Sequence, residues 1–553
     1  MFDTKQTTLF DVASGKSKSS KSIFVQSALK DSAKTLSENG ALKYSTTGDA
    51  LVDQFGKLGT YRAPRSFSEI SKDCDAVWAE NKELSVLFSF YCRMITRKTQ
   101  LSNGYVTSVP QKGAELKHEG IFRMIWLHVK DETIFWDNIG LFVSAGSWKD
   151  IFTMLKYDLE YNGWKGRKLN WDKFGQLILA GLNNETTVNL VKKYLPQIKA
   201  KSKCTTLESQ ANTLIGKWVA SLLFGKKESS FNYKQYRLLK NSGTAHEWQK
   251  LISQKKHNLI DFSKIHGRAL NLLVRGKYLA NQGLTAKYED WVTSDETEVK
   301  YTGFVHELFE KLPRSLSDLD KGKQATVNKQ FDTLVSKGKS GDMADTSLIV
   351  VRDTSSSMTW GNADGVNMTP HQISKALALY FSEFLTGKFA NAWIEFADSA
   401  KMHTWKGNTP LEKWYNDGAE AYGSTNFQAV IQLFAQLKGQ GVPESEFPTG
   451  ILCMSDGEFN PSALGKTNVE SARLTLRNAG FSKEFADNFV IVLWNVSGGG
   501  RGGKFETHGD VENVFYFSGY SASTVSFLTS EIRTAKELFL EAMNQEVLNM
   551  IKF

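Results

Sequence analysis

The segment LIVVRDTSSSMTW, residues 348–360, places an apolar run directly before an aspartate and a cluster of hydroxyl side chains. Four consecutive apolar residues are typical of a strand that is buried on both faces. At Asp353 the pattern becomes D-x-S-x-S, which is too polar to continue into a core. The segment therefore predicts a central strand of a covered sheet with a polar loop at its carboxyl end.

Five apolar runs, of which this strand is the first, alternate with amphipathic stretches. The runs cover residues 346–351, 392–397, 449–454, 488–496 and 513–517. The helical stretches lie near residues 371–386, 425–438, 467–480 and 531–550. This alternation indicates a doubly wound parallel α/β sheet, in which ligands bind beyond the carboxyl ends of the strands. We expect this domain to span residues 345–553.

Oxygen donors follow three parts of the predicted sheet. Asp353, Ser355 and Ser357 lie in the first loop, Thr425 lies in YGSTNF (422–427), and Asp456 lies in CMSDGEF (453–459). Two carboxylates with hydroxyls, and without His or Cys, form a ligand set that favours Mg²⁺ or Mn²⁺ over zinc. The hydroxyls leave much of the ion's charge uncompensated, so water or an acidic partner group can complete the shell. A Ser/Thr helix cap is the alternative for the first loop, but it does not explain the two later residues.

This constellation resembles the metal-ion-dependent adhesion site of von Willebrand factor A domains. The resemblance assigns Asp353, Ser355 and Ser357 to the D-x-S-x-S loop, Thr425 to the single threonine and Asp456 to the distal aspartate. It implies a bound Mg²⁺ or Mn²⁺ that contacts an acidic residue of a protein partner. A hydrolase is disfavoured, because no serine lies in a G-x-S-x-G elbow and Ser355 stands where an aspartyl phosphatase has a second acid.

Residues 61–335 have helical periodicity, as in 81–98, 171–182 and 262–280. The spacing of Gly, Asn and Pro breaks indicates about a dozen helices in stacked pairs, without a close internal sequence repeat. Residues 334–345 are the expected linker. Residues 1–60 are rich in Ser, Lys, Thr and Gly, and we expect them to form a flexible basic arm.

The net charge of +9 is divided unevenly along the chain. From Gly341 onward there are 16 basic and 24 acidic residues, whereas the first 340 residues contain 52 and 35, a net charge of +17. Such asymmetry favours a polyanionic partner for the first part. The alternative is a highly soluble basic domain without a role in nucleic-acid binding.

Two clusters in the basic part combine cations with aromatic rings, YNGWKGRKLNW (161–171) and FGKKESSFNYKQYRLLK (224–240). Cations neutralise phosphates, and aromatic rings can stack on unpaired bases. The alternative is a solvated helix face whose aromatic residues point inward. The candidate RNA-binding residues are Lys165, Arg167, Lys168, Lys226, Lys227, Lys234, Arg237 and Lys240, beside Trp164, Trp171, Tyr233 and Tyr236.

A basic helical domain followed by such an A domain is similar to the TROVE family of Ro autoantigen-like RNA-binding proteins, and to a sister family known only as a domain of unknown function. The sister family is indicated by four motifs, AGSWKDIFTML (145–155), KKYLPQIKAKS (192–202), YRLLKNSG (236–243) and STNFQAV (424–430). The Ro-like resemblance implies a HEAT-like helical ring that binds single-stranded RNA ends or small structured RNAs, as in a ribonucleoprotein. The A domain would close the ring.

A nucleotide-binding loop and catalysis are both disfavoured. GGGRGGK (498–504) fits the P-loop spacing, but Phe505 stands where a Mg²⁺-binding Ser or Thr belongs, and no helix pattern follows. A mobile loop or an RGG-like RNA contact explains it better. Without an activated nucleophile, an acid–base pair or a phosphate loop, we expect no enzymatic activity.

The remaining features predict a cytoplasmic protein without a membrane segment. Cys74, Cys92, Cys204 and Cys453 lack CxxC spacing, as expected of reduced thiols. No apolar stretch approaches the roughly 20 residues that span a bilayer, and residues 1–20 lack a signal core. Two functions remain open. The first is a non-catalytic RNA-binding scaffold with a metal site, and the second is a metal-dependent protein-adhesion or assembly module that does not bind RNA.

Overall fold

The structure is a computed structural model that divides into two compact units. It describes residues 33–102, 106–161, 168–225, 230–243, 246–265, 267–339, 347–385, 389–463, 465–498, 505–509, 511–521 and 532–553. Among these, the helical unit comprises residues 65–261 and 545–553, and the sheet unit comprises residues 33–64 and 262–544. Each unit therefore contains segments that are far apart in the sequence.

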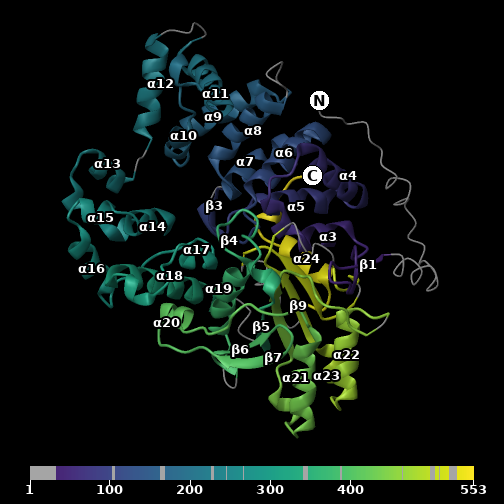
Figure 1. Cartoon of the computed structure of the whole chain (residues 1–553). Coiled ribbons are helices and arrows are strands. Elements are labelled where there is room, and N and C mark those ends of the chain that lie inside the picture. Colours follow the sequence, from purple (N-terminus) through teal and green to yellow (C-terminus); the bar gives the residue numbers. More distant parts are fainter. Residues whose placement is uncertain are drawn as a thin grey trace. The chain divides into compact units, whose positions relative to one another are not determined.

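The helical unit consists mainly of helices that contact their neighbours in the sequence (Figure 1). Its helices are α4 (Phe67–Glu80), α5 (Lys82–Arg93), α6 (Lys117–Lys130), α7 (Glu132–Ala145), α8 (Trp148–Tyr161), α9 (Trp171–Asn183), α10 (Val188–Tyr194), α11 (Leu207–Phe224), α12 (Ser230–Ser242) and α13 (Glu247–Ser253), with short 3-10 turns η2 (Lys201–Lys203) and η3 (His257–Leu259). A hairpin of β3 (Arg97–Ser102) and β4 (Val106–Gln111) interrupts them. The helical part of the predicted fold class is confirmed.

Local signals in the sequence explain where these helices begin. The Ser66 and Glu69 side chains form a capping box at the start of α4, and Asn81 and Asp131 cap α5 and α7. Such side chains satisfy backbone N–H groups that have no partner within the helix. In the part of the chain that the structure describes, no helix is long and apolar enough to cross a membrane.

Buried ion pairs and the C-terminal segment complete the helical unit. Arg93 Nε donates to Asp150 Oδ2 at 2.7 Å, and both side chains are buried. The segment 545–553 is held by Asn138, whose amide donates to the carbonyl of Lys552 at 2.7 Å and accepts from its backbone N–H at 2.8 Å. The sequence predicts a helix over 531–550, but α24 (Ala535–Met543) is shorter, and the chain after it packs with the helical unit.

The sheet unit is built on six strands in the order β10-β9-β8-β5-β6-β7. The strands are β5 (Leu348–Asp353), β6 (Ala392–Phe396), β7 (Ala400–Thr404), β8 (Gly450–Ser455), β9 (Val490–Asn495) and β10 (Val514–Ser518). All pairs are parallel except β6 with β7, which is antiparallel. The five parallel strands are those predicted from the apolar runs, and β7 adds an edge strand that the sequence analysis does not include.

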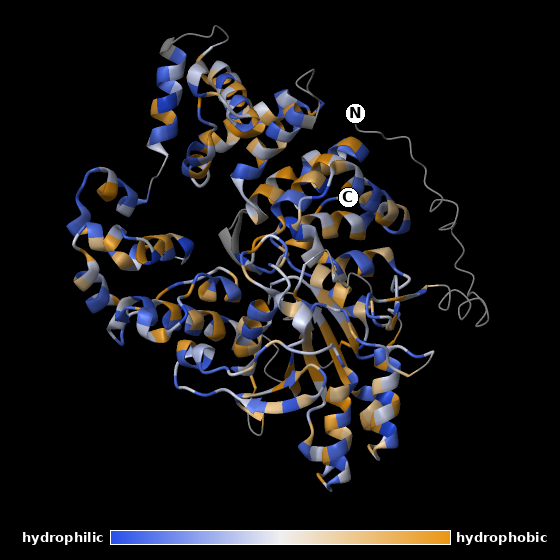
Figure 2. Ribbon diagram, viewed as in Figure 1, coloured by the Kyte–Doolittle hydropathy of each residue, from blue (hydrophilic) through white to orange (hydrophobic). Residues whose placement is uncertain are grey.

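Helices cover both faces of this sheet, as a doubly wound fold requires. Helix α19 (Pro370–Ser382) contacts β5, β6 and β8, while α21 (Gln428–Gly439) contacts β6 and β7 (Figure 1). On the α21 face, strand residues such as Ile349 and Ile451 form a core with α22 (Asn468–Asn478) and α23 (Lys483–Asn488). Figure 2 shows the central strands coloured mostly as hydrophobic. The α/β part of the predicted fold class is confirmed.

Residues 33–62 are ordered, which corrects the predicted flexible arm over residues 1–60 in its second half. They form β1 (Lys34–Leu36), β2 (Leu42–Tyr44), α3 (Ala50–Gly56) and the 3-10 turn η1 (Leu58–Arg62). Both α3 and η1 contact β10, and Tyr44 N donates to Phe505 O at 2.6 Å. Apolar residues such as Leu51 and Phe55 bury this segment against the sheet unit. SGKSKSSKS (14–22), which motivated the prediction of an arm, lies outside the described residues.

The boundary predicted near residue 335 also differs from the division of the structure. Residues 262–339 belong to the sheet unit. There α18 (Lys321–Lys339) contacts α16 (Thr285–Thr293), α17 (Val305–Phe309) and α20 (Pro410–Tyr415), and α17 also contacts α19. These elements are η4 (Phe262–Lys264), α14 (Gly267–Arg275), α15 (Tyr278–Asn281), α16 (Thr285–Thr293), α17 (Val305–Phe309), η5 (Leu316–Asp318) and α18 (Lys321–Lys339). Composition cannot show this, because these helices resemble the preceding ones and differ only in what they pack against.

The docking of residues 33–62 makes a prediction for Gly59, which lies against the backbone of Ser518 and Gly519. A Cβ at position 59 would overlap these backbone atoms, which cannot rotate away. We expect Gly59→Ala to destabilise the sheet unit by about 1–3 kcal/mol, measured by thermal unfolding of the full chain. Gly439→Ala is the control, because a Cβ there meets nothing within 4 Å. Equal stability of the two variants would contradict this docking.

Candidate metal centre

The predicted metal-binding residues lie at the carboxyl ends of β5 and β8, which are neighbours in the sheet. Asp353 is the last residue of β5, and Asp456 directly follows the last residue of β8. From β5 the chain continues to β6 on one side, and it later returns to β8 on the other side. The site therefore occupies the point where the strand order reverses, which is the usual ligand site of such sheets.

Hydrogen bonds fix the orientation of the Asp353 carboxylate. Its Oδ1 accepts from Ser355 N at 2.8 Å, and its Oδ2 accepts from Ser455 Oγ at 2.5 Å. The Ser355 and Ser357 hydroxyls are 3.1 Å apart. Asp353 and Ser355 are buried, and Ser357 is partly exposed. The D-x-S-x-S loop thus gathers a carboxylate and two hydroxyls at one point, as predicted.

Thr425 reaches the same region through backbone contacts between two loops. Tyr422 N donates to Thr354 O at 2.8 Å, and Ser356 N donates to Gly423 O at 3.2 Å. Gly423 has a φ of +67°, and a Cβ there would overlap the Asp398 carboxylate. Since glycine adopts this conformation without strain, it allows the loop to pass this closely. Thr425 itself is buried.

The loop that carries Asp456 is held by the N-terminal hairpin, β1 and β2. Lys43 Nζ donates to Gly457 O at 3.0 Å, Asn39 Nδ2 donates to Glu458 O at 2.5 Å, and Ser37 Oγ donates to Phe459 O at 3.2 Å. Lys43 also lies 3.7 Å from the Glu458 carboxylate. No local signal in the sequence relates Ser37, Asn39 and Lys43 to a loop more than 400 residues away, so their role could not be predicted.

Asp353 and Asp456 form a pair of buried carboxylates, and this pair fits a cation. Burial, and then the charge of Asp456, raise the pKa of Asp353 well above its usual value. Asp456 Oδ1 accepts from Glu458 N at 3.3 Å, whereas Oδ2 is buried without a hydrogen-bond partner among the described residues. Because two adjacent buried carboxylates are costly without compensation, a hard divalent cation suits this donor set.

A cavity of about 130 Å³ opens above these side chains. It is lined by Ser357, Trp360, Gly361, Asn362, Asp364, Pro370, Asp456 and Ser497. Trp360 is 68% exposed, an unusual position for the largest apolar side chain. The cavity gives a ligand access to Ser357 and Asp456, with an aromatic ring beside its entrance.

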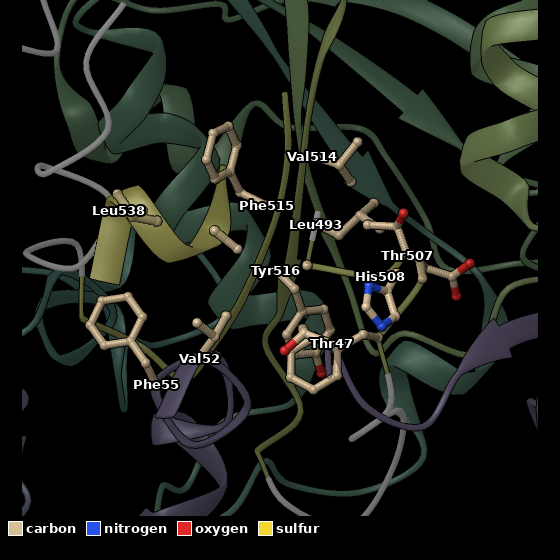
Figure 3. Close-up of a pocket in the computed structure, with 15 residues that line it drawn as sticks. Thr47, Val52, Phe55, Leu493, Thr507, His508, Val514, Phe515, Tyr516 and Leu538 are labelled. Atoms are coloured by element: carbon tan, nitrogen blue, oxygen red, sulfur yellow. The ribbon is translucent and has the colours of Figure 1, made fainter. Parts of the chain in front are cut away.

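A second, smaller pocket of about 20 Å³ contains the buried carboxyl group of Glu506. Figure 3 shows its walls, which include Val52 and Phe55 of α3, Leu538 of α24 and Tyr516 of β10. Neither Glu506 oxygen has a hydrogen-bond partner among the described residues. Burial raises the pKa of Glu506 to about 8, against the opposing charge of Lys43.

The predicted RNA-binding residues differ in their surroundings, and some of them are not described by the structure. Lys168, Lys234 and Arg237 are exposed. Lys240 instead donates to the carbonyl of Leu195 at 2.5 Å, near the C-terminal end of α10, which is a structural role. Lys165, Arg167, Lys226 and Lys227, together with Trp164, lie outside the described residues.

Two of the aromatic rings proposed as stacking surfaces are core residues. Trp171 is buried and donates from Nε1 to Asp158 Oδ2 at 2.7 Å. Tyr236 is fully buried, and its hydroxyl donates to Pro196 O at 2.7 Å. For these two rings the alternative given above, aromatic residues that point inward, therefore holds in place of base stacking. Both satisfy a polar group inside the helical unit, while Lys168, Lys234 and Arg237 face solvent.

Comparison with known proteins finds a family model that matches part of this chain and a solved structure that aligns with it. A family model described as a domain of unknown function (DUF7788) matches residues 347–550, which include STNFQAV (424–430). The crystal structure of the Ro (RSR) protein of Deinococcus radiodurans aligns with 12% sequence identity and a TM-score of 0.31, covering 77% of this chain and 87% of that chain. No curated protein matches this chain.

The paired carboxylates make a prediction for Asp456→Asn, which removes one of two adjacent charges and keeps the acceptor used by Glu458 N. In EDTA we expect this variant to be at least as stable as the wild type. Mg²⁺ or Mn²⁺ at about a hundredfold excess over its Kd should stabilise the wild type by about 2.7 kcal/mol but not the variant. Differential scanning calorimetry measures both effects.

Ser356→Ala is the matched control for Asp456→Asn, since Ser356 occupies a variable position of the D-x-S-x-S loop and is not one of the predicted ligands. It should respond to the metal like the wild type. Equal stabilisation of Asp456→Asn and wild type by Mn²⁺ would rule out Asp456 as a ligand.

Glu506 makes a prediction for the pH dependence of stability. Because its folded pKa, about 8, lies above its unfolded value, the folded chain binds the proton more tightly, and stability falls as pH rises from about 5 to about 8. We expect Glu506→Gln to reduce this fall by about 3 kcal/mol. The exposed Glu541→Gln is the control, and denaturant titrations at several pH values provide the measurement. An identical pH dependence in all three proteins would contradict the prediction.

Proposed function

We propose that this chain is a non-catalytic scaffold of the Ro-like type. In this proposal the sheet unit holds Mg²⁺ or Mn²⁺ and the helical unit binds RNA. The observation that carries the proposal is the pair of buried carboxylates, Asp353 and Asp456, beside clustered hydroxyls at the switch point of the sheet.

The metal would be held by Asp353, Ser355, Ser357, Thr425 and Asp456. When bound, it supplies a positive charge that attracts an acidic group of a partner through the cavity. Ser455 and Ser355 N hold the Asp353 carboxylate in place for this role. Among the described residues that line the cavity there is no histidine or lysine, the usual bases that activate a serine. This supports binding rather than catalysis.

RNA binding is supported by the charge of the helical unit. Residues 65–261 and 545–553 contain 31 basic and 20 acidic residues, whereas residues 33–64 and 262–544 contain 32 and 36. The excess of cations thus belongs to the helical unit alone. Lys168, Lys234 and Arg237 present three of these charges to solvent. Single-stranded RNA ends are the expected ligand class, since basic channels admit one strand more readily than a duplex.

Trp360 supports a second candidate function, a metal-dependent protein-adhesion module that does not bind RNA. This ring is exposed beside the metal cavity, and exposed tryptophans are frequent anchors of protein interfaces. A protein partner that offers one carboxylate to the metal and an apolar pocket to Trp360 would use both features.

The proposed RNA binding is tested by changing Lys234 and Arg237 together to Ala. Both are exposed on α12, so the unit should keep its fold. We expect about tenfold weaker binding of single-stranded RNA at low salt. The slope of log K against log salt should fall by about 1.4, because two phosphate contacts are lost. Filter binding across a salt series measures both quantities.

The control is Lys466→Ala with Lys483→Ala, which removes the same charge from exposed positions of the sheet unit. Equal RNA affinity of both double variants would exclude this face of α12. If the full chain binds no RNA at low salt while Mn²⁺ still stabilises it, the adhesion module is the correct function.

A further inference from the structure

The sheet unit contains a larger cavity, of about 510 Å³, that the metal site does not use. It lies between the end of α17, the start of α19 and α20. Its lining residues are Phe309, Lys311, Leu312, Pro313, Arg314, Asn367, Met368, His371, Gln372, Lys375, Trp414 and Tyr415. Its volume falls in the range of about 300–1,000 Å³ that is typical of small-molecule sites.

The charged side chains among these lining residues are all basic, namely Lys311, Arg314 and Lys375. Lys311 and Arg314 are exposed. Lys375 Nζ lies 3.3 Å from Asp417 Oδ2, and the buried Arg352 donates to the same oxygen at 2.8 Å. One buried carboxylate therefore serves two cations, which leaves an excess of positive charge under the cavity. Such an excess favours an anionic ligand.

Aromatic rings form one wall of the cavity and hold its shape. Phe309 and Trp414 stack with centroids 4.4 Å apart, and Lys375 Nζ lies 4.5 Å from the Trp414 centroid. The Tyr415 hydroxyl donates to Pro313 O at 2.8 Å and ties the loop that carries Lys311 and Arg314 to α20. The loop backbone is thus held against α20 and Lys375 against the aromatic wall, whereas the exposed Lys311 lies 3.8 Å from the Glu310 carboxylate.

The start of α19 adds to the attraction for an anion. Thr369 and Gln372 form a capping box at the start of this 13-residue helix, whose first turn carries a partial positive charge. Pro370 lines the metal cavity and His371 lines the larger one, so the first turn of the helix borders both. Burial, and then the charge of Arg352, lower the pKa of His371 to about 3, so the ring is neutral.

We propose that this cavity binds a nucleotide, with its phosphate at Lys311, Arg314 and Lys375 and its base against the aromatic wall. The three cations attract the phosphate, and the apolar lining with Met368, Leu312 and Pro313 suits a planar base more than it suits a free phosphate ion. The nucleotide is either a free mononucleotide or the phosphorylated end of an RNA. In the second case the inference rests on the proposed RNA binding and assigns the strand's end to the sheet unit.

The test uses calorimetric titration of the full chain at low salt with adenosine monophosphate, inorganic phosphate, and hexauridylate with or without a 5′-phosphate. The variant is Lys311→Asn with Arg314→Gln. Asn is chosen because Lys311 has a φ of +61°, which Asn tolerates well. The control is Lys401→Asn with Lys406→Gln, at exposed positions outside the cavity.

We expect adenosine monophosphate to bind the wild type and the control alike, and the cavity variant at least about tenfold more weakly. Tighter binding of 5′-phosphorylated hexauridylate than of the mononucleotide identifies the RNA end as the source, and the reverse identifies a free nucleotide. Inorganic phosphate that binds as tightly as the nucleotide would overturn the assignment, and so would equal losses in variant and control.

The outcomes separate this inference from the proposed function. Loss of nucleotide binding in the cavity variant, with the α12 double variant unaffected, supports the cavity even if the helical unit binds no RNA. RNA binding that depends on α12 alone, with no nucleotide bound at any concentration tested, overturns the cavity and leaves the proposed function in place.

Discussion

The arrangement of the sheet unit depends on one electrostatic constraint, the burial of two carboxylates at the ends of adjacent strands. Asp353 and Asp456 are both fully buried, and a low-dielectric site does not hold two adjacent charges cheaply. The surrounding loops supply hydroxyls and N–H groups rather than lysines or arginines. Ser455 and the backbone of Ser355 satisfy Asp353, yet one oxygen of Asp456 has no partner within the described chain. This unsatisfied oxygen is the observation that supports the proposed cation site.

Hydrogen bonds from two distant segments hold the loops that carry these carboxylates in position. The loop at 422–425 is joined to the D-x-S-x-S loop by backbone hydrogen bonds, and the loop after Asp456 is joined to the N-terminal hairpin. Each contact uses backbone carbonyls, which fix position without adding charge. A basic residue at the same distance would compensate the carboxylates and compete with a cation. Lys43 donates to the carbonyl of Gly457 and forms its ion pair with Glu458 rather than with Asp456.

The sequence predicts the sheet well because its strands are buried on both faces and read as uninterrupted apolar runs. Asp353, Ser355 and Ser357 could be placed because they are local to one strand end, and Asp456 because it follows another. The orientation of the aromatic rings in the basic half could not be predicted in the same way. Trp171 and Tyr236 lie next to cations in the sequence but turn into the core, where each finds a buried acceptor. The ordered hairpin at 34–44 and the cavity beside Trp414 depend on contacts between distant segments, which a composition-based reading cannot reveal.

The two ends of the chain have a consequence for how the protein is made. The sheet unit begins before residues 65–261 and resumes after them, so these helices are inserted within a discontinuous domain, and residues 545–553 then return to the helical unit. The hairpin that supports the Asp456 loop is synthesised more than 400 residues before its partner. Since domains fold as they emerge from the ribosome, this hairpin must remain unpaired while the inserted helices form. Helix α3 contacts β10 and α24, so its apolar face is covered only after residues 514–543 have been synthesised, near the end of translation.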